Sequence, residues 1–388
     1  VDCDWSSDVC SSDLENLRIP VEKISKLEAI EVKVPLPEPV LVGTTVFKVR
    51  TYTVVKITTE NGIVGVGYSY SRGLPIREII LNMLSPLVIG SDIEDSEKLR
   101  LQILATYWHS AEHGTFTAAV SAVDIAIWDA LGKLKNKSIA QLLGQKRNTL
   151  PVSYVIGYKY GNDESGLIRD VEQALNRGVR NFKMVVGAGS AERDANRMKE
   201  VRRLVGPEGK IGVDAFRSLK SIDDAIERVL ALQPYELDFM EDPFLESQGR
   251  LAIELREKTG ARIAFGESQF GHRGIANLVV NNYVDVVRVD ALIVGGIKEF
   301  LMSAEVAAES KLQVSTHIHS EIHAPLAAAI DNLYEGGLEY MDPILDVDVV
   351  HLLMHNPIQI INGEFHISNE PGFGVDWDWN AVKKYSEN

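Results

Sequence analysis

The sequence predicts an α/β protein in which a parallel barrel follows an α+β region. From Pro151 onward, eight apolar runs of four to six residues alternate with seven stretches of helical periodicity. Such an alternation is typical of parallel strands joined by helices, and eight strands favour a closed barrel over an open sheet. Residues 24–147 have a different order, with strand patterns first and helical patterns afterwards. These observations define the fold class before any single residue is considered.

The first region has two parts. Residues 24–70 contain the β-branched run VFKVRTYTVVKI and an ENG turn, and they are expected to form an antiparallel meander. Residues 76–147 have apolar positions at three- and four-residue spacing, which is typical of helices. The segment 118–133 is apolar all round, which predicts a buried helix. Its polar members are therefore expected to pack or cap, rather than to catalyse: Asp124, Trp128 and Asp129.

The second region supplies the barrel. Its strands are expected at residues 152–156, 181–186, 210–214, 238–241, 263–266, 286–290, 312–316 and 338–341. Its helices are expected at residues 164–177, 191–205, 221–232, 248–258, 274–280, 297–309 and 320–330. The tail at 357–379 has the pattern of a hairpin that returns to pack elsewhere.

Composition excludes several function classes. The 388 residues are 45% hydrophobic and 24% charged, as in ordinary globular proteins of this length. A formal net charge of −15 argues against nucleic acid, because phosphate binding needs a basic surface. Cys3 and Cys10 are the two cysteines, so a reducing, cytoplasmic compartment is expected. No apolar stretch approaches 18 residues, so no membrane span is expected. Residues 1–16 repeat SSD, do not resemble a signal peptide, and are expected to be non-native or disordered.

Three acidic residues each end a short apolar run. Asp214, Glu241 and Glu267 close the runs KIGVD, DFME and IAFGE, and they lie 27 and 26 residues apart. This spacing is one strand–helix unit, so their carboxylates are expected at the same end of neighbouring strands, where barrel active sites lie. Like charges this close repel by several kcal/mol in a partly buried setting. A hard divalent cation offsets that repulsion, and all-oxygen ligation suits Mg²⁺.

The same end of the predicted barrel gathers further ionisable groups. A single Asp after a strand is more often a helix N-cap than a ligand, and Asp242, beside Glu241, is interpreted as such a cap. A regular series is different evidence, because chance does not repeat it. The last polar residues of seven strands recur at intervals of 22 to 31 residues: Lys183, Asp214, Glu241, Glu267, Asp290, His317 and Glu339.

These residues and their neighbours resemble the enolase superfamily, and within it the mandelate racemase-like group of acid-sugar dehydratases and racemases. The resemblance extends over about residues 24–380. It is carried by AVSAVDIAIWDALGK (119–133), FKMV (182–185), VDAF (213–216), MEDP (240–243), GES (266–268), DALIVGGI (290–297), STH (315–317) and LEY (338–340). It implies a modified TIM barrel, (β/α)₇β, with an α+β capping domain. The implied division is a cap at 17–149, a barrel at 150–350, and a segment at 351–388 that returns to the cap.

The resemblance also implies roles. The three spaced carboxylates match the group's Mg²⁺ ligands, and Asp290 with His317 matches its acid/base pair. Glu339 matches an acid that hydrogen-bonds the substrate carboxylate, and Lys183 adds positive charge on the opposite side. The shared chemistry is abstraction of the proton α to a carboxylate, in which bound Mg²⁺ offsets the charge of the developing enediolate. Asp290 orients His317 and favours its imidazolium form.

Two positions depart from the pattern of the group. Val185 stands where relatives usually carry a second lysine that acts as a base, and Phe216 stands where they carry Asn or His. Residues i and i+2 of a strand share a face, so Lys183 points inward but one layer deeper. Racemisation needs acid/base groups on both faces of the enediolate, whereas syn elimination of water needs one, which His317 can supply. The sequence therefore favours a Mg²⁺-dependent dehydratase that converts a sugar acid, aldonate or aldarate, into a 2-keto-3-deoxy acid.

Other interpretations stay open. A racemase or epimerase is the first, with Tyr158 or Tyr160 replacing the missing group, although packing under the cap is the commoner role for such tyrosines. A catalytically degenerate barrel that keeps the metal and acts as a binding protein is the second. The segment HIHSEIH at 317–323 could ligate zinc, but the carboxylates already define a harder, all-oxygen site.

The expected partner is a small carboxylate substrate, with neither nucleic acid nor membrane. The residues expected to contact that substrate are Arg50, Tyr158, Tyr160, His319 and Glu321. For Arg50, as for Lys48 on the same strand, a solvent-facing strand edge is an equal alternative. A homo-oligomer is expected only by analogy with relatives.

Overall fold

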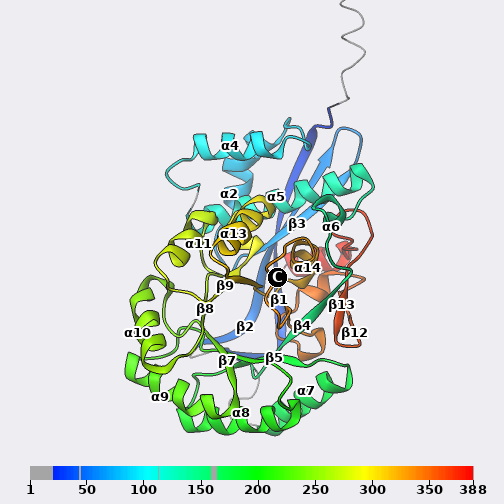
Figure 1. Ribbon diagram of the computed structural model, residues 1–388. Helices are drawn as coiled ribbons and strands as arrows, with labels where there is room; N and C mark the ends of the chain where they lie inside the picture. Colours follow the sequence, from blue (N-terminus) through cyan, green and yellow to red (C-terminus); the bar gives the residue numbers. More distant parts are fainter. Residues whose placement is uncertain (1–20, 43–44, 112, 159–163, 388) are drawn as a thin grey trace, which may run out of the picture.

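The computed structural model describes residues 21–42, 45–111, 113–158 and 164–387. The N-terminal segment 1–16, with both cysteines, and Tyr160 lie outside the described residues. The rest of the chain forms a barrel-like parallel sheet surrounded by helices, with an α+β region packed across one end (Figure 1).

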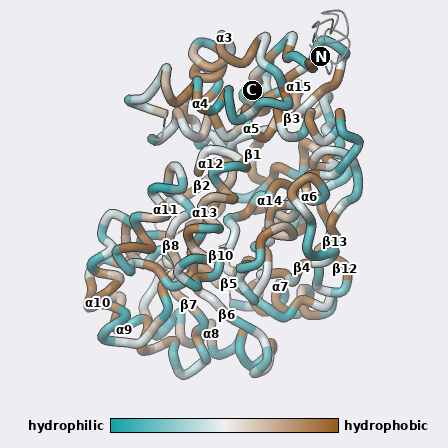
Figure 2. Tube along the Cα trace, turned by 45° about the horizontal axis from the view of Figure 1, so that its top comes forward, coloured by the Kyte–Doolittle hydropathy of each residue, from teal (hydrophilic) through white to brown (hydrophobic). Residues whose placement is uncertain are grey.

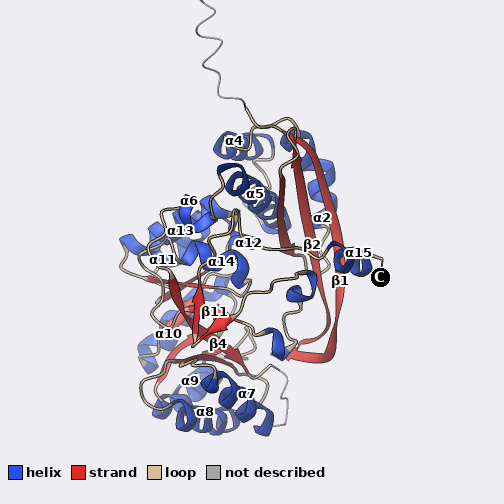
Figure 3. Ribbon diagram, turned by 90° about the vertical axis from the view of Figure 1, so that its right-hand side faces the viewer, coloured by secondary structure: helices blue, strands red, loops and turns tan. Residues whose placement is uncertain are grey.

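The N-terminal region is a three-stranded antiparallel sheet covered by helices. Its strands are β1 Ile24–Val42, β2 Thr45–Thr59 and β3 Val64–Tyr70, in the order β1-β2-β3. Its helical segments are α2 Ile76–Ile79, the π-helix η1 Ile80–Leu84, α3 Ser85–Val88, α4 Ser96–Thr106, α5 Gly114–Lys135 and α6 Ile139–Leu142. The predicted meander and the helices after it are confirmed. Figure 3 shows β1 and β2 as a long ribbon along one side of the molecule.

Helix α5 packs unusually close to β3. A Cβ atom at Gly65 would lie 2.1 Å from the backbone oxygen of Ala126, and one at Gly67 would lie 2.3 Å from that of Ala122. Only glycine permits this approach, so these two positions seat the helix on the sheet. The polar side chains of this buried helix are predicted to pack or cap. Asp129 does so, since it accepts hydrogen bonds from the backbone N–H groups of Val66 (2.9 Å) and Phe373 (3.0 Å).

The statement that no apolar stretch approaches 18 residues does not hold for this helix. Among the described residues, α5 is long and apolar enough, by length and composition, to cross a membrane, with a hydropathy of 1.2 over 18 residues. However, 72% of that window is buried inside the protein. The apolar surface is therefore used in packing, as is usual for the core helix of a globular fold.

The barrel strands agree closely with the prediction. They are β4 Thr149–Ile156, β5 Asn181–Val185, β6 Ile211–Asp214, β7 Leu237–Glu241, β8 Ile263–Phe265, β9 Val286–Val289, β10 Gln313–Thr316 and β11 Leu338–Tyr340. All neighbours in the series β10-β9-β8-β7-β6-β5-β4-β11 pair in parallel. The end strands of this series are β10 and β11. Val314 of β10 forms a parallel bridge with Leu333, which lies five residues before β11 begins.

Helices join consecutive strands around the outside. They are α7 Glu164–Asn176, α8 Ala191–Val205, α9 Ile222–Leu232, α10 Gly249–Thr259, α11 Gly271–Val280, α12 Ala291–Val294, α13 Ile297–Glu309 and α14 Ser320–Ala327, with short 3₁₀ turns η2 Gln233–Tyr235 and η3 Glu246–Gln248. Hydrophobic and hydrophilic stretches alternate along these outer helices (Figure 2). This is the pattern of helices with one face on the sheet.

The C-terminal segment contacts both regions. It contains η4 Pro343–Leu345, η5 Val350–Leu353, β12 Ile360–Ile361, β13 Glu364–His366 and α15 Trp379–Ser386. The predicted hairpin is β12–β13, and β13 pairs antiparallel with β4 of the barrel. Helix α15 then packs against β1 (Figure 3).

The two regions share a continuous core and direct hydrogen bonds. Buried side chains of the barrel and of one face of the β1–β3 sheet belong to one cluster, including Val54, Tyr68 and Val213. On the barrel-facing side of α5, Asp124 accepts from the N–H of Ile297 at 2.7 Å, and Ser121 accepts from that of Gly295 at 2.9 Å. These contacts fix the cap across the C-terminal ends of the strands, where the ionisable residues gather.

Candidate active site at the carboxyl ends of the barrel strands

The ionisable residues at the strand ends come together. Parallel neighbours carry them to one end of the sheet, as the periodic spacing predicts. Six of these side chains are at least nine-tenths buried, and His317 is the partly exposed member of the set. The gathered residues are Lys183 on β5, Asp214 on β6, Glu241 on β7, Glu267 after β8, Asp290 after β9, His317 after β10 and Glu339 on β11.

Asp290 and His317 form a hydrogen-bonded pair. The His317 Nδ1 lies 2.8 Å from Asp290 Oδ2, and the other carboxylate oxygen, Oδ1, accepts from the N–H of Leu292 at 2.8 Å. Burial alone would raise the pKa of Asp290, but hydrogen bonds with His317 and His323 outweigh it and hold that pKa well below its ordinary value. The carboxylate therefore stays ionised and receives Nδ1–H, which leaves His317 Nε2 as the atom able to accept a proton.

The three spaced carboxylates lie beside this pair. Asp214 Oδ1 accepts from the N–H of Phe216 at 2.8 Å, and Glu267 Oε2 lies 3.6 Å from His317 Nε2. Glu241 Oε1 is buried and has no hydrogen-bond partner among the described residues. Burial raises the pKa of both Asp214 and Glu241, so the protein alone does not fully compensate their charge.

This donor set fits a hard cation. Its atoms are all carboxylate oxygens, and the unpartnered Glu241 oxygen is a buried acceptor that a cation would satisfy. Within the described ranges, however, no three Asp, Glu, His or Cys side chains are arranged so that they could hold a metal ion as they stand. Positively charged side chains contact these carboxylates instead.

Two of these cations lie inside the cluster. Lys183 Nζ donates to Glu241 Oε2 at 2.8 Å and to Glu339 Oε2 at 2.9 Å, which confirms that Lys183 points inward. Arg288, on β9, was not among the predicted site residues. Its Nη2 lies 3.1 Å from Glu241 Oε1 and 3.5 Å from Glu267 Oε2, and it also contacts Glu339. The signal for it was the sequence VVRVD, because a residue two before Asp290 on a strand faces the same side.

Arg217 compensates the cluster from the other side. Its Nη2 pairs with Asp242 and lies 2.9 Å from Glu267 Oε1. Asp242 is therefore not the helix cap that the sequence suggested; it is a buried partner of Arg217. Burial opposes ionisation of Glu267, but His317, Arg288 and Arg217 together hold its pKa well below the ordinary value.

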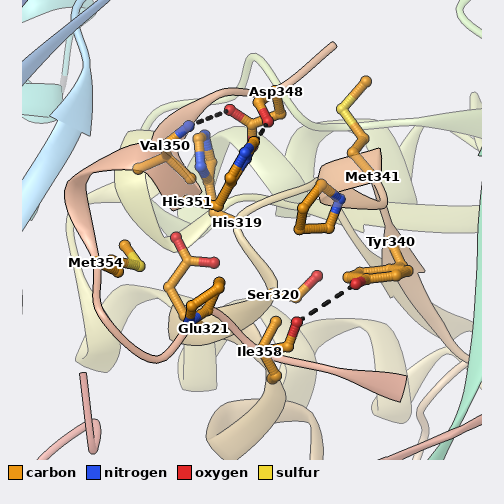
Figure 4. A pocket seen from close by; sticks show the side chains of 12 residues that line it. His319, Ser320, Glu321, Tyr340, Met341, Asp348, Val350, His351, Met354 and Ile358 are labelled. Atoms are coloured by element: carbon orange, nitrogen blue, oxygen red, sulfur yellow. Dashed lines mark hydrogen bonds between the residues drawn. The ribbon is translucent and has the colours of Figure 1, made fainter. Parts of the chain in front are cut away.

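His319 and Glu321 face the cap. Tyr68 of β3 lies with its hydroxyl 3.0 Å from His319 Nδ1 and donates to Glu321. Burial lowers the pKa of His319 to about 4 and raises that of Glu321 to about 7. Both residues line a small pocket with Asp348 from the C-terminal segment (Figure 4). The hydrogen bonds that the described residues offer these two side chains come from a protein group, Tyr68, and their expected contact with substrate stays a prediction.

The zinc interpretation of residues 317–323 finds no support. His317 bonds to Asp290, His319 to Tyr68, and His323 to the N–H of Ala291 (2.9 Å) and the carbonyl of Ile318 (2.7 Å). The imidazoles point to different partners because Ile318 and His319 have left-handed backbone, with φ of 31° and 49°. This turn separates side chains that are close in sequence.

A cavity opens over His317 between the cap and the barrel. It encloses about 140 Å³ and is lined by Phe47, Arg50, Tyr70, Arg72, Tyr158, Phe216, His317, Ile318, Met341 and Asp348. Of the residues expected to contact substrate, Arg50 and Tyr158 line this cavity, whereas His319 and Glu321 line the neighbouring pocket. Phe216 contributes an aromatic wall in place of a polar group, with a positive φ of 46°.

Arg50 is buried, so it is not part of a solvent-facing strand edge. Its Nε donates to the carbonyl of Val347 at 2.9 Å, and its Nη1 donates to the Tyr70 hydroxyl. Lys48, two residues earlier, is exposed. Arg72 lies over the Tyr70 ring at 4.9 Å and has positive φ, 52°. Two guanidinium groups therefore lie at the end of the cavity that the cap provides.

Comparison with known proteins identifies the class. The enolase C-terminal domain-like family matches residues 166–381, and the mandelate racemase/muconate lactonizing enzyme N-terminal domain matches residues 25–144. The chain therefore belongs to the mandelate racemase/muconate lactonizing enzyme group of the enolase superfamily. This confirms the resemblance and, with it, the predicted fold class.

Individual relatives are similar at about a quarter of positions. Arabinonate dehydratase of Saccharolobus solfataricus is 27% identical over 82% of this chain and 86% of its own length. L-talarate/galactarate dehydratase of Salmonella typhimurium is 26% identical over 83% and 79%. The structure of L-talarate dehydratase from Polaromonas, complexed with Mg and L-glucarate, has a TM-score of 0.84 at 25% identity, covering 94% of this chain and 97% of that one.

The relatives do not share one reaction. Besides dehydratases they include cycloisomerases and a racemase. These relatives are enzymes, and two neighbouring structures contain magnesium with a small carboxylate, L-glucarate in one and mandelic acid in the other. The reaction of this chain must therefore be argued from its own residues.

Proposed function

We propose that the protein is a Mg²⁺-dependent dehydratase of a sugar acid, which yields a 2-keto-3-deoxy acid. One observation carries the proposal: His317, held by Asp290, lines the cavity, while hydrophobic side chains occupy the positions where relatives carry further bases. Val185 is buried at the end of β5, and Phe216 lines the cavity wall. An acid/base group on one face of the substrate is sufficient for syn elimination.

Asp214, Glu241 and Glu267 would hold the metal. When bound there, Mg²⁺ supplies the positive charge that lowers the energy of an enediolate. Their oxygens are the ligands that this ion prefers, and their burial keeps the charge in a medium of low dielectric constant. Lys183 and Glu339, which bond to each other at 2.9 Å, lie beside them and orient the substrate carboxylate.

His317 does the proton transfer. Its Nε2 removes the α-proton, and the electron pair of that C–H bond passes into the carboxylate. The imidazolium then returns the proton to the β-hydroxyl on the same face as the C–O bond breaks, so that water leaves and an enol remains. The enol tautomerises to the 2-keto acid. Asp290 fixes the Nδ1–H tautomer and stabilises the imidazolium.

The cap end of the cavity favours an aldarate over an aldonate. Arg50 is nine-tenths buried, and its Nη2 makes no hydrogen bond among the described residues, so this nitrogen is available to a ligand. Arg72 adds a second positive charge at the same end. The distal carboxylate of an aldarate would pair with both arginines, while the other end of the substrate would lie at the acidic cluster.

A racemase is the second candidate, and Tyr158 is the observation in its favour. This tyrosine lines the cavity with His317. Burial raises its pKa well above the ordinary value, so the phenol could donate a proton but is a poor base. Such a group would support reprotonation in one direction only.

The test is a panel of matched aldonates and aldarates with Mg²⁺, followed for 2-keto acid formation and for deuterium exchange at the α-carbon. We expect loss of water from at least one aldarate. No turnover of any acid by a protein that binds Mg²⁺ would refute the dehydratase and favour a binding protein. Exchange with inverted product and no loss of water would favour the racemase.

Arg50→Met, with Lys48→Met as the exposed control on the same strand, tests the substrate class. A lost charge-assisted hydrogen bond should lower kcat/KM for the aldarate by about 10- to 100-fold. The matched aldonate should be affected far less, and Lys48→Met should change neither. An equal loss for both acids would contradict the assignment of the distal carboxylate to Arg50.

A further inference from the structure

Arg288 occupies an unexpected place in the acidic cluster. It is among the largest fully buried side chains of the protein, with 1% of its surface exposed. Its Nη1 donates to Ser315 Oγ at 2.9 Å, which anchors the guanidinium between β9 and β10. From there Nη2 reaches two of the three proposed metal ligands, Glu241 and Glu267, and also Glu339.

The contact with Glu241 is electrostatic rather than directional. Arg288 Nη2 lies 3.1 Å from Glu241 Oε1, yet that oxygen makes no hydrogen bond within the part of the chain that the structure describes. The guanidinium therefore reduces the negative potential at the oxygen without using its lone pairs. The oxygen stays available to a cation, but any cation that binds there must do so next to a fixed positive charge.

Lys183 differs from Arg288 in this respect. It donates well-formed hydrogen bonds to Glu241 and Glu339, and it lies 3.8 Å from Asp214. Its ammonium does not contact Glu267. Arg288 is thus the internal cation that bridges Glu241 and Glu267, on the face where the proposed ligands meet.

We propose that Arg288 is a built-in competitor of Mg²⁺: it stabilises the carboxylate cluster of the metal-free protein and thereby weakens metal binding. The inference rests on the proposed ligand set, but not on the reaction. Repulsion between a guanidinium and a divalent cation is strong in a buried site, where water screens little. Without Arg288, the carboxylates would repel one another in the metal-free protein and gain more from Mg²⁺.

The test is Arg288→Met, with Mg²⁺ binding measured by calorimetry and thermal unfolding measured in EDTA and in Mg²⁺. We expect the Kd for Mg²⁺ to fall by at least tenfold. The midpoint of unfolding should fall in EDTA and recover in Mg²⁺, so that the stabilisation by metal becomes larger than in the wild type. Arg288→Lys keeps a charge at that position, so its Kd for Mg²⁺ should lie between those of the wild type and of Arg288→Met.

Arg228→Met is the matched control, because Arg228 is also a buried, ion-paired arginine but pairs with Asp194 and Asp224 rather than with the proposed ligands. It should lower the unfolding midpoint equally with and without Mg²⁺ and leave the Kd unchanged. An unchanged or higher Kd for Mg²⁺ in Arg288→Met would overturn the proposal and make Arg288 a residue that positions the ligands. If Arg288→Met does not fold, Arg288→Gln supplies the same comparison.

The ligand set is checked separately. Asp214→Asn should abolish Mg²⁺ binding whether or not the protein is a dehydratase. Full binding by that variant would overturn both the ligand assignment and the role of Arg288. An absence of turnover with tight Mg²⁺ binding would instead count against the proposed reaction alone.

Discussion

Two buried ion clusters in this barrel differ in their balance of charge. Near the start of α8, Asp194 and Asp224 pair with Arg197 and Arg228, so two acids meet two bases. At the strand ends, three cations, Lys183, Arg217 and Arg288, face five buried carboxylates: Asp214, Glu241, Asp242, Glu267 and Glu339. A balanced cluster needs nothing further, whereas the acidic surplus of the other is compensated only when another cation binds.

The difference separates burial for stability from burial for function. The Asp194 cluster ties α8 and α9 to the backbone, since Arg197 donates to Val185 O at 2.8 Å and Arg228 donates to Gly189 O at 3.0 Å. The strand-end cluster keeps a buried carboxylate oxygen of Glu241 for which the described ranges offer no hydrogen-bond partner. Proteins retain such unfavourable groups chiefly at functional sites.

The largest expected effect is on chemistry at the acidic cluster. His317→Asn should lower dehydration by about 10³-fold or more and abolish α-proton exchange, because it removes the proton acceptor while keeping a similar shape. Chemical denaturation should show nearly unchanged stability. Persistent exchange would assign the base to Lys183 or to a tyrosine.

The balanced cluster should show the reverse behaviour. Asp194→Ala leaves Arg197 and Arg228 as buried charges without their shared partner, so the free energy of unfolding should fall by about 3–5 kcal/mol. Calorimetry on the folded fraction should give the wild-type Mg²⁺ affinity. A changed affinity would mean that the two clusters are coupled through β5, and the contrast between them would lose its basis.

A smaller effect of opposite sign is expected for Glu241→Gln. Burial raises the pKa of Glu241, so the charged form is unfavourable in the metal-free protein. Neutralising it should therefore stabilise the metal-free fold by about 1–2 kcal/mol while it weakens Mg²⁺ binding. Urea unfolding in EDTA measures the first effect. Destabilisation would show that the ion pairs with Lys183 and Arg288 outweigh the repulsion.

The smallest effect concerns pH. Burial raises the pKa of Asp124, which joins α5 to α13, to about 7. The folded state then holds this proton up to about pH 7, whereas the unfolded chain releases it near pH 4. Stability is therefore lost as pH rises between these values, by about 1–2 kcal/mol for this partly exposed group. Asp124→Asn should remove that part of the slope in unfolding measured between pH 5 and pH 8; an unchanged slope would contradict it.

Much of the fold was readable because its signals are local. Each barrel strand is a short apolar run before a helix, so β4 to β11 agree with the predicted runs within a few residues. The same regular spacing of strands predicts that Lys183, Asp214, Glu241 and the other strand-end residues lie together at one end of the barrel. Roles that depend on distant partners are harder to predict. The position of Asp242 after a strand predicts a cap, whereas its partner Arg217 lies 25 positions away and joins it only across the loops.

The sequence by itself determined the series of strands, the spacing of the carboxylates, and the absence of a lysine at position 185, because strand periodicity and residue identity do not depend on the rest of the fold. Tertiary structure decided which charges compensate them. In the sequence, Arg288 is a single arginine in an apolar strand. Its role appears only in the folded structure, where β7, β8 and β11 bring three carboxylates to it. Likewise Arg50 becomes a cavity residue only when the cap closes and Val347, 297 positions away, accepts its hydrogen bond.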